Sequence, residues 1–157
     1  MFYESDKKLN PLETVDFQVN VEMSKLIFAN SVANSLIFTV DGFLPTKSMD
    51  KTVLIIAKAL TNVSISDKKQ FAINRLKQTN QFEIKKIESE KEIIIDKISG
   101  YEIIALGFNK KTGATEKLYQ LILFTSNSYY ILFGSTDNEF EKNINELRGV
   151  AQTFKRK

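Results

Sequence analysis

The sequence predicts an α+β fold in which helices lie against one antiparallel sheet. Two apolar runs, 118–124 and 129–133, are rich in β-branched and aromatic residues, and the short polar stretch 125–128 separates them as in a hairpin. A helical pattern follows at 140–151 and needs a sheet to cover its apolar stripe. Because the connections in this half are short, we expect neighbouring strands to be antiparallel.

The length and composition predict one ordinary globular domain. The chain has 157 residues, of which 43% are hydrophobic and 26% charged. Residues 1–13 are polar and contain a proline, so we expect a flexible N-terminal segment followed by a single α+β domain at 14–157. No apolar run is long enough for a transmembrane segment.

The sequence pattern predicts strands in the N-terminal half. Strict alternation of apolar and polar residues over 15–21 predicts a half-buried strand. The tripeptide Leu-Ile-Phe occurs at 26–28 and again at 36–38 around a polar connection, which predicts a hairpin, although the first part also tolerates a helix. A loop is expected at 41–50, and the nearly continuous apolar run 52–60 predicts a central strand.

The middle of the chain predicts a helix and then a meander of strands. The helix covers 66–78, with Ser66 as its N-cap. Short turns at 88–90, 99–100, 109–114 and 125–128 would connect the strands. The expected strands are 82–87, 92–98, 101–108, 115–125 and 129–134.

The terminal helix carries the best-defined pattern. Thr136 and Glu139 fit a capping box, in which the hydroxyl and the carboxylate satisfy the first backbone N–H groups. Phe140 opens the apolar stripe, so we expect it to be a core anchor. Gly149 either ends the helix or lies inside it at a cost of about 1 kcal/mol relative to Ala. The stripe continues through Ile144, Leu147 and Ala151.

Composition excludes several classes of function. The chain has no Cys and no His, which removes thiolate and imidazole nucleophile chemistry, disulfides and the usual zinc sites. We therefore expect no catalytic residues, no cofactor and no metal. The net charge is +3, and the signs are interspersed except in the tail 155–157, which reads as a solvated end; no nucleic-acid partner is expected.

Four motifs in the sequence have simpler explanations than a functional site. Gly107 to Gly113 has the wrong spacing for a phosphate loop and reads as a hairpin turn. The acidic cluster lacks the ordered spacing of a calcium or magnesium site and reads as a solvated strand rim. Three tyrosines could form a base-stacking platform, but cross-strand packing is favoured. Asn62 begins a glycosylation pattern that is common by chance. The acids are Glu88, Glu90, Glu92 and Asp96, and the tyrosines are Tyr119, Tyr129 and Tyr130.

Residues 66–157 resemble the PsbP-like family, which includes an extrinsic photosystem II subunit, a nuclear-import factor that binds the GTPase Ran, and bacterial secreted or lipid-anchored proteins. The N-terminal part departs from the family pattern and the chain has no Trp. The resemblance implies an αβα sandwich used as a non-catalytic binding or assembly module. It is carried by Ser99-Gly100-Tyr101, Lys111-Thr112-Gly113, Tyr129-Tyr130 and the closing Thr153-Phe154-Lys155.

Exclusion and resemblance together predict a non-catalytic structural or protein-interaction module of the cell envelope, whose partner is another protein. A carrier of a small apolar ligand is the alternative, and a carboxylate-based hydrolase is a third. The first residues show no signal peptide. The sequence leaves localisation open between a secreted or lipid-anchored protein, if a leader precedes Met1, and a cytoplasmic one. It also leaves open the oligomeric state, the binding residues and the identity of the partner.

Overall fold

The computed structural model describes residues 10–157. Most of the expected flexible segment, residues 1–9, lies outside the described residues. The described chain begins with a short helix, α1 (Pro11–Thr14). The side chain of Asn10 caps this helix by accepting a hydrogen bond from the backbone N–H of Leu12 at 3.0 Å.

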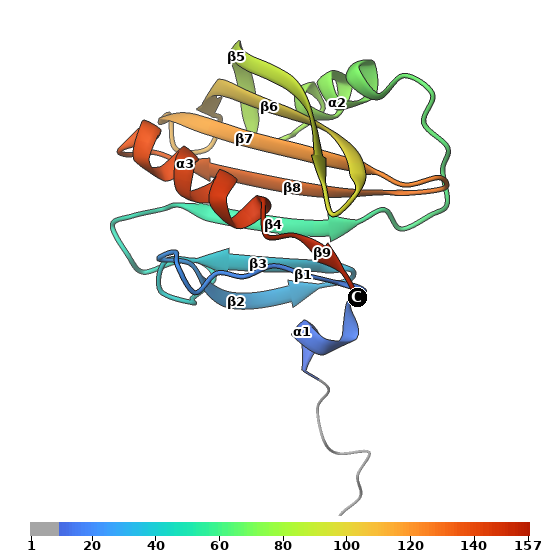
Figure 1. Cartoon of the computed structure of the whole chain (residues 1–157). Coiled ribbons are helices and arrows are strands. Elements are labelled where there is room, and N and C mark those ends of the chain that lie inside the picture. The colour runs from blue at the N-terminus through green and yellow to red at the C-terminus, as the bar shows by residue number, and fades with distance from the viewer. Residues whose placement is uncertain (1–9) are drawn as a thin grey trace, which may run out of the picture.

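A seven-stranded sheet with the order β2-β3-β4-β8-β7-β6-β5 forms the centre of the molecule (Figure 1). Every neighbouring pair is antiparallel, which confirms the predicted fold class. The predicted hairpin at 26–38 is confirmed, and the predicted strand at 52–60 lies inside the sheet between β3 and β8. The strands are β2 (Ile27–Val32), β3 (Ser35–Thr39), β4 (Val53–Lys58), β5 (Phe82–Ile95), β6 (Ile98–Asn109), β7 (Thr115–Phe124) and β8 (Tyr129–Thr136).

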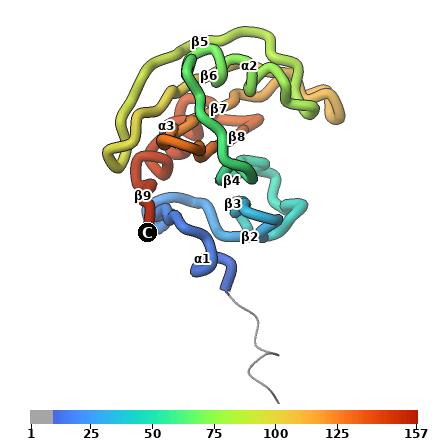
Figure 2. The backbone as a smooth tube through the Cα atoms, turned by 90° about the vertical axis from the view of Figure 1, so that its right-hand side faces the viewer, coloured from blue at the N-terminus to red at the C-terminus, as the bar shows by residue number. Residues whose placement is uncertain are grey.

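The two longer helices lie on opposite faces of this sheet, which makes an αβα sandwich (Figure 2). Helix α3 (Phe140–Ala151) packs on β7 and β8, and helix α2 (Lys68–Lys77) packs on β5, β6 and β7. Alternate residues of each strand face the two helices, so the core has two layers. The layer under α3 contains Leu54, Ile56, Tyr119, Leu132 and Leu147, and the layer under α2 contains Ala72, Leu76, Ile103, Leu118 and Ile122.

The strand predicted at 15–21 is much shorter in the structure. Only β1 (Phe17–Gln18) forms a ladder, and its partner is β9 (Lys155–Arg156) near the end of the chain. The predicted alternation nevertheless holds, since Phe17 is fully buried and stacks on Phe154 with ring centroids 5.8 Å apart. The prediction of a longer strand was wrong because its partner β9 has only two residues, and the flanking valines pack on the core without a neighbouring strand.

The two strands predicted at 82–87 and 92–98 are one strand in the structure. β5 runs through 88–90 without a turn and accommodates this polar stretch with two shifts of register against β6. The reversal occurs at Asp96 and Lys97, whose φ angles of 52° and 62° suit a two-residue hairpin, and the turn predicted at 99–100 was wrong because these residues lie inside β6. The polar stretch belongs to an exposed edge strand, where charged residues are favoured, and this explains why it looked like a connection.

The capping box predicted for the terminal helix was also wrong. Thr136 is the last residue of β8, and its hydroxyl accepts a hydrogen bond from Asn143 at 3.0 Å. Glu139 takes the N-cap position at φ 36° without a side-chain cap. As a result Phe140 is only half-buried and is not the core anchor that was expected, while Gly149 lies inside the helix. Helix α2 is capped by Asp67 rather than the predicted Ser66.

Candidate functional site

Helix α2 packs mainly on β5, β6 and β7 and leaves side chains of β4 and β8 partly exposed on the same face of the sheet. The strand registers align Ile37 of β3, Ile55 of β4, Phe133 of β8 and Gln120 of β7 in one row across this face. Gln120 marks the border of the helix, because its side-chain amide donates to the backbone carbonyl of Ala72 at 2.9 Å. Beyond that border Ile55 and Phe133 are partly exposed, so apolar side chains of β4 and β8 face the solvent beside α2.

Two adjoining hollows follow this uncovered strip, and we call them together the groove. The first has a volume of about 230 Å³ and the second a volume of about 450 Å³. They share Ala57, Arg75 and Ile131, so they meet in the middle of the strip. The rest of the first hollow is lined by Val53, Ile55, Thr79, Gln81, Phe82, Gln120, Phe133 and Ser135, and the rest of the second by Lys58, Ala59, Leu60, Thr61, Val63, Phe71 and Tyr129.

The charged residues that line the groove are both positive. Lys58 is engaged, because its ammonium lies 2.6 Å from the Asp16 carboxylate, and this hydrogen bond raises the pKa of Lys58. Arg75 of α2 is half-buried and lies where the two hollows meet. Within residues 10–157 its guanidinium has no ion-pair or hydrogen-bond partner. The groove therefore combines an apolar floor with one cation that has no partner.

The sequence contained a signal for this groove, but the prediction interpreted it differently. β4 is apolar at every position from Val53 to Ala57, which is typical of a strand covered on both faces. In the structure Leu54 and Ile56 are fully buried on the α3 side, whereas Val53, Ile55 and Ala57 are only partly buried on the α2 side. Sequence alone could not show that a ten-residue helix falls short of this strand.

The glycine-rich motif and the acidic cluster have structural roles. Residues 109–114 form the predicted hairpin turn, with Gly113 at φ 79°. The four acids do not converge: Glu88 pairs with Lys117, and Asp96 pairs with Arg156. No group of three or more side chains suited to a metal ion occurs within residues 10–157.

Two of the three tyrosines are buried, and Tyr129 is partly exposed beside the groove. Tyr119 and Tyr130 are buried in the layer under α3. Tyr129 points to the other face, where its ring lies 5.0 Å from that of Phe71 of α2. Since adjacent residues of a strand face opposite sides, the pair at 129–130 offers no common surface to a nucleic-acid base.

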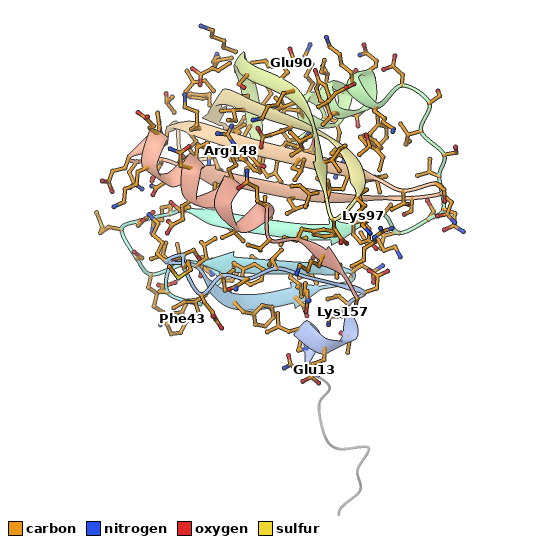
Figure 3. The ribbon with its side chains drawn as sticks, in the orientation of Figure 1. Glu13, Phe43, Glu90, Lys97, Arg148 and Lys157 are labelled. Atoms are coloured by element: carbon orange, nitrogen blue, oxygen red, sulfur yellow. The ribbon has the colours of Figure 1, made fainter. Side chains whose placement is uncertain are left out.

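Sequence reasoning missed a buried ion pair between α3 and the sheet. Glu102 of β6 is 2% exposed, and its carboxylate accepts hydrogen bonds from Tyr119 at 2.8 Å and from Arg148 at 3.0 and 3.2 Å. Arg148 reaches from α3 toward the strands (Figure 3). An acid inside the otherwise apolar stretch around 101–106 was the signal that could have revealed this pair.

The protein is similar to known proteins in its structure rather than in its sequence. No family model and no curated protein matches the sequence. A protein from Bacteroides thetaiotaomicron superposes with a TM-score of 0.54 and 13% identity over 90% of this chain, which spans 45% of the length of that protein. PA94 of Pseudomonas aeruginosa, a protein of unknown function, gives 0.54 and 15% over 80% of this chain and 84% of its own. LpqN of Mycobacterium tuberculosis, involved in cell envelope biogenesis, gives 0.55 and 12% over 88% and 81%.

These similarities show a shared fold and do not assign a function. Within the described part of the chain no helix has the length and apolar character to cross a membrane.

Proposed function

We propose that this chain is a non-catalytic module that binds another protein at the groove beside α2. The observation that carries this proposal is the row of apolar side chains on β4 and β8 that the helix leaves partly exposed. Covering such side chains removes apolar area from water, which is the main driving force of association. A partner protein laid along the strip would cover it.

The shape of the groove supports a protein partner over the alternative, a carrier of a small apolar ligand. The floor residues Val53, Ile55 and Phe133 are themselves partly exposed, so the groove is open along one side. A small ligand there would keep one side in water, whereas ligand pockets usually bury about 70 to 90% of the ligand surface.

The proposed absence of catalysis rests on the available side chains. The chain has no His or Cys, and the alternative of a carboxylate-based hydrolase would need two carboxylates that converge in a pocket with shifted pKa values. Burial raises the pKa of Glu116, but this side chain is 6% exposed and binds Asn109 at 2.8 Å. No carboxylate lines either hollow of the groove.

We further propose that the module acts at the cell envelope and belongs to the PsbP-like family. Support for the first comes from LpqN, which shares the fold and is involved in cell envelope biogenesis. Support for the second comes from the sequence resemblance over 66–157 and from the αβα arrangement. Neither the envelope setting nor the family membership is needed for the groove to bind a protein.

The experiment that tests the proposed function is affinity capture from the source organism with the whole chain as bait. Ile55→Lys places a charge on the floor of the groove, and Ile94→Lys places the same charge on β5, where Ile94 is 75% exposed and outside the groove. We expect one stoichiometric protein that the wild type and Ile94→Lys retain and that Ile55→Lys loses. Equal capture by all three baits, with both variants folded by circular dichroism, would refute the proposed site.

A further inference from the structure

We propose that the groove takes an extended segment of the partner protein in which one acidic side chain, flanked on both sides by apolar side chains, pairs with Arg75. This inference rests on the proposed function and adds the chemistry of the partner. It depends on three features of the structure: the cation without a partner, its position between the two hollows, and the absence of acids from the groove lining.

Arg75 differs from the other arginines of the chain. Arg148 binds the carboxylate of Glu102 and Arg156 pairs with Asp96, whereas Arg75 has no anionic partner within residues 10–157. A guanidinium presents five donors in a planar fork that matches a carboxylate. Because Arg75 is half-buried beside an apolar floor, an incoming carboxylate would be screened less by water than at an exposed lysine. Its pairing would then be stronger than a surface ion pair.

The position of Arg75 within the groove decides what kind of acid fits. Apolar lining continues on both sides of it, through Ile55 and Phe133 in one hollow and through Val63 and Phe71 in the other. A fatty acid or a chain terminus carries its carboxylate at one end, so binding at Arg75 would leave one hollow empty. An extended segment with an internal acidic side chain would fill both hollows with the apolar side chains on either side of the acid.

The length of the strip fixes the length of this segment. The floor follows the six residues of β4, which span roughly 20 Å at the usual rise of a strand. An extended segment of about six residues would cover the same distance. The ammonium of Lys58, at the end of the strand, lies over the ring of Tyr130 on the α3 side of the sheet and pairs with Asp16, so Arg75 is the cation available to the partner.

Peptide selection provides the first test, because the partner is unidentified. A phage-displayed library of random twelve-residue peptides is selected on the immobilised wild-type chain, with Ile55→Lys as a counter-selection bait. We expect enriched peptides to share an Asp or Glu between apolar residues. Enriched peptides that depend on Ile55 but share no acid would overturn the inference and leave the proposed function standing.

Affinity measurements on the best selected peptide provide the second test. We expect Arg75→Gln to weaken binding at least about tenfold, which is the effect of losing a hydrogen-bonded charge pair. Lys77→Gln is the matched control, since it removes the same charge from the same helix at an exposed position outside the groove, and we expect no change beyond twofold. A peptide with Arg in place of its acid should bind Arg75→Glu more tightly than it binds the wild type.

The remaining outcomes are also decisive. Equal binding by the wild type and Arg75→Gln refutes the pairing. Failure to enrich any peptide that Ile55→Lys rejects refutes the proposed function as well. Binding of sodium decanoate that Arg75→Gln abolishes, without any bound peptide, replaces the protein segment with a small apolar acid.

Discussion

Arg148 of α3 binds Glu102 of β6 through two hydrogen bonds, from Nη2 to Oε1 at 3.0 Å and from Nε to Oε2 at 3.2 Å. The Glu102 side chain is 2% exposed and Arg148 is 26% exposed, so the pair lies at the buried edge of the contact between the helix and the sheet. Tyr119 donates to the same carboxylate. This cluster connects α3 to the sheet, and the donors of Arg148 and Tyr119 satisfy the buried carboxylate of Glu102.

Removing one partner of this pair should therefore destabilise the protein. We expect Arg148→Met to cost about 2 to 4 kcal/mol of unfolding free energy, because it leaves a buried carboxylate with fewer donors. The triple variant Glu102→Met, Tyr119→Phe, Arg148→Met should be more stable than Arg148→Met, since it removes the charge together with its partners. Urea unfolding measures both. An unchanged midpoint for Arg148→Met would show that the pair does not stabilise the fold.

The second prediction compares two glycines. A Cβ at Gly134 of β8 would lie 2.8 Å from Leu147 of α3 and 3.1 Å from the backbone oxygen of Val53, so Gly134→Ala should cost about 1 to 3 kcal/mol. A Cβ at Gly149, inside α3, meets nothing within 4 Å, so Gly149→Ala should stabilise by about 0.5 to 1 kcal/mol. Thermal unfolding of the two variants checks both signs. A stabilising Gly134→Ala would mean that α3 lies farther from β8 than described.

Phe140 and Leu147 provide a third test, because both belong to the predicted apolar stripe of α3 but Phe140 was expected to be its anchor. The structure leaves Phe140 half-buried at the start of α3 and buries Leu147 completely. We expect Phe140→Ala to cost about 1 to 2 kcal/mol and Leu147→Ala about 2 to 5 kcal/mol. A larger loss of unfolding free energy for Phe140→Ala than for Leu147→Ala in chemical denaturation would show that Phe140 is the anchor of the helix.

The fourth prediction concerns pH and the loop between β3 and β4. Burial alone would raise the pKa of Asp41, but hydrogen bonds from Thr46, from the backbone of Phe43 and Lys47, and from Thr39 outweigh it and lower the pKa to about 2. A lowered pKa stabilises the folded state above the ordinary value of 3.8, and this contribution is lost as pH falls toward 2.

Asp41→Asn should accordingly flatten the dependence of the unfolding free energy on pH between 3.8 and 2. Glu22→Gln is the control, because Glu22 is exposed and its carboxylate makes no hydrogen bond within residues 10–157. Parallel urea titrations across this pH range decide the matter. If the wild type and Asp41→Asn lose stability equally on acidification, the hydrogen bonds of Asp41 do not lower its pKa in the folded state.

The elements that could be predicted are those whose sequence signals are local, and the elements that were missed depend on residues far apart in the chain. The hairpins at 26–38 and 115–136 and the helix stripe of Ile144 and Leu147 were predictable because their signals lie within a few residues. The turn at Asp96 was missed because the reversal was predicted at 99–100, which lies inside β6. A second turn was wrongly predicted at 88–90, where a polar stretch on an exposed edge strand resembles a connection. The cap of α3 was misassigned because Thr136 has partners far away in the chain, among them Thr52 at 2.9 Å.

The groove could be predicted only in part, because it is formed by residues that are far apart in the chain. The apolar character of β4 was visible, but the border of α2 depends on Gln120 and Ala72, which are 48 positions apart. The sequence pattern did not single out Arg75, and only the fold places it between two apolar hollows.

The most direct test of the central claim is an amide chemical-shift titration of the labelled chain with a peptide selected as described above. The account predicts that the shifted resonances lie on β4, β8 and the side of α2 that carries Arg75, with little change on α3 or the free edge of β2. Shifts confined to the α3 face or to the β2 edge would contradict it, because binding would then occur where the groove is not.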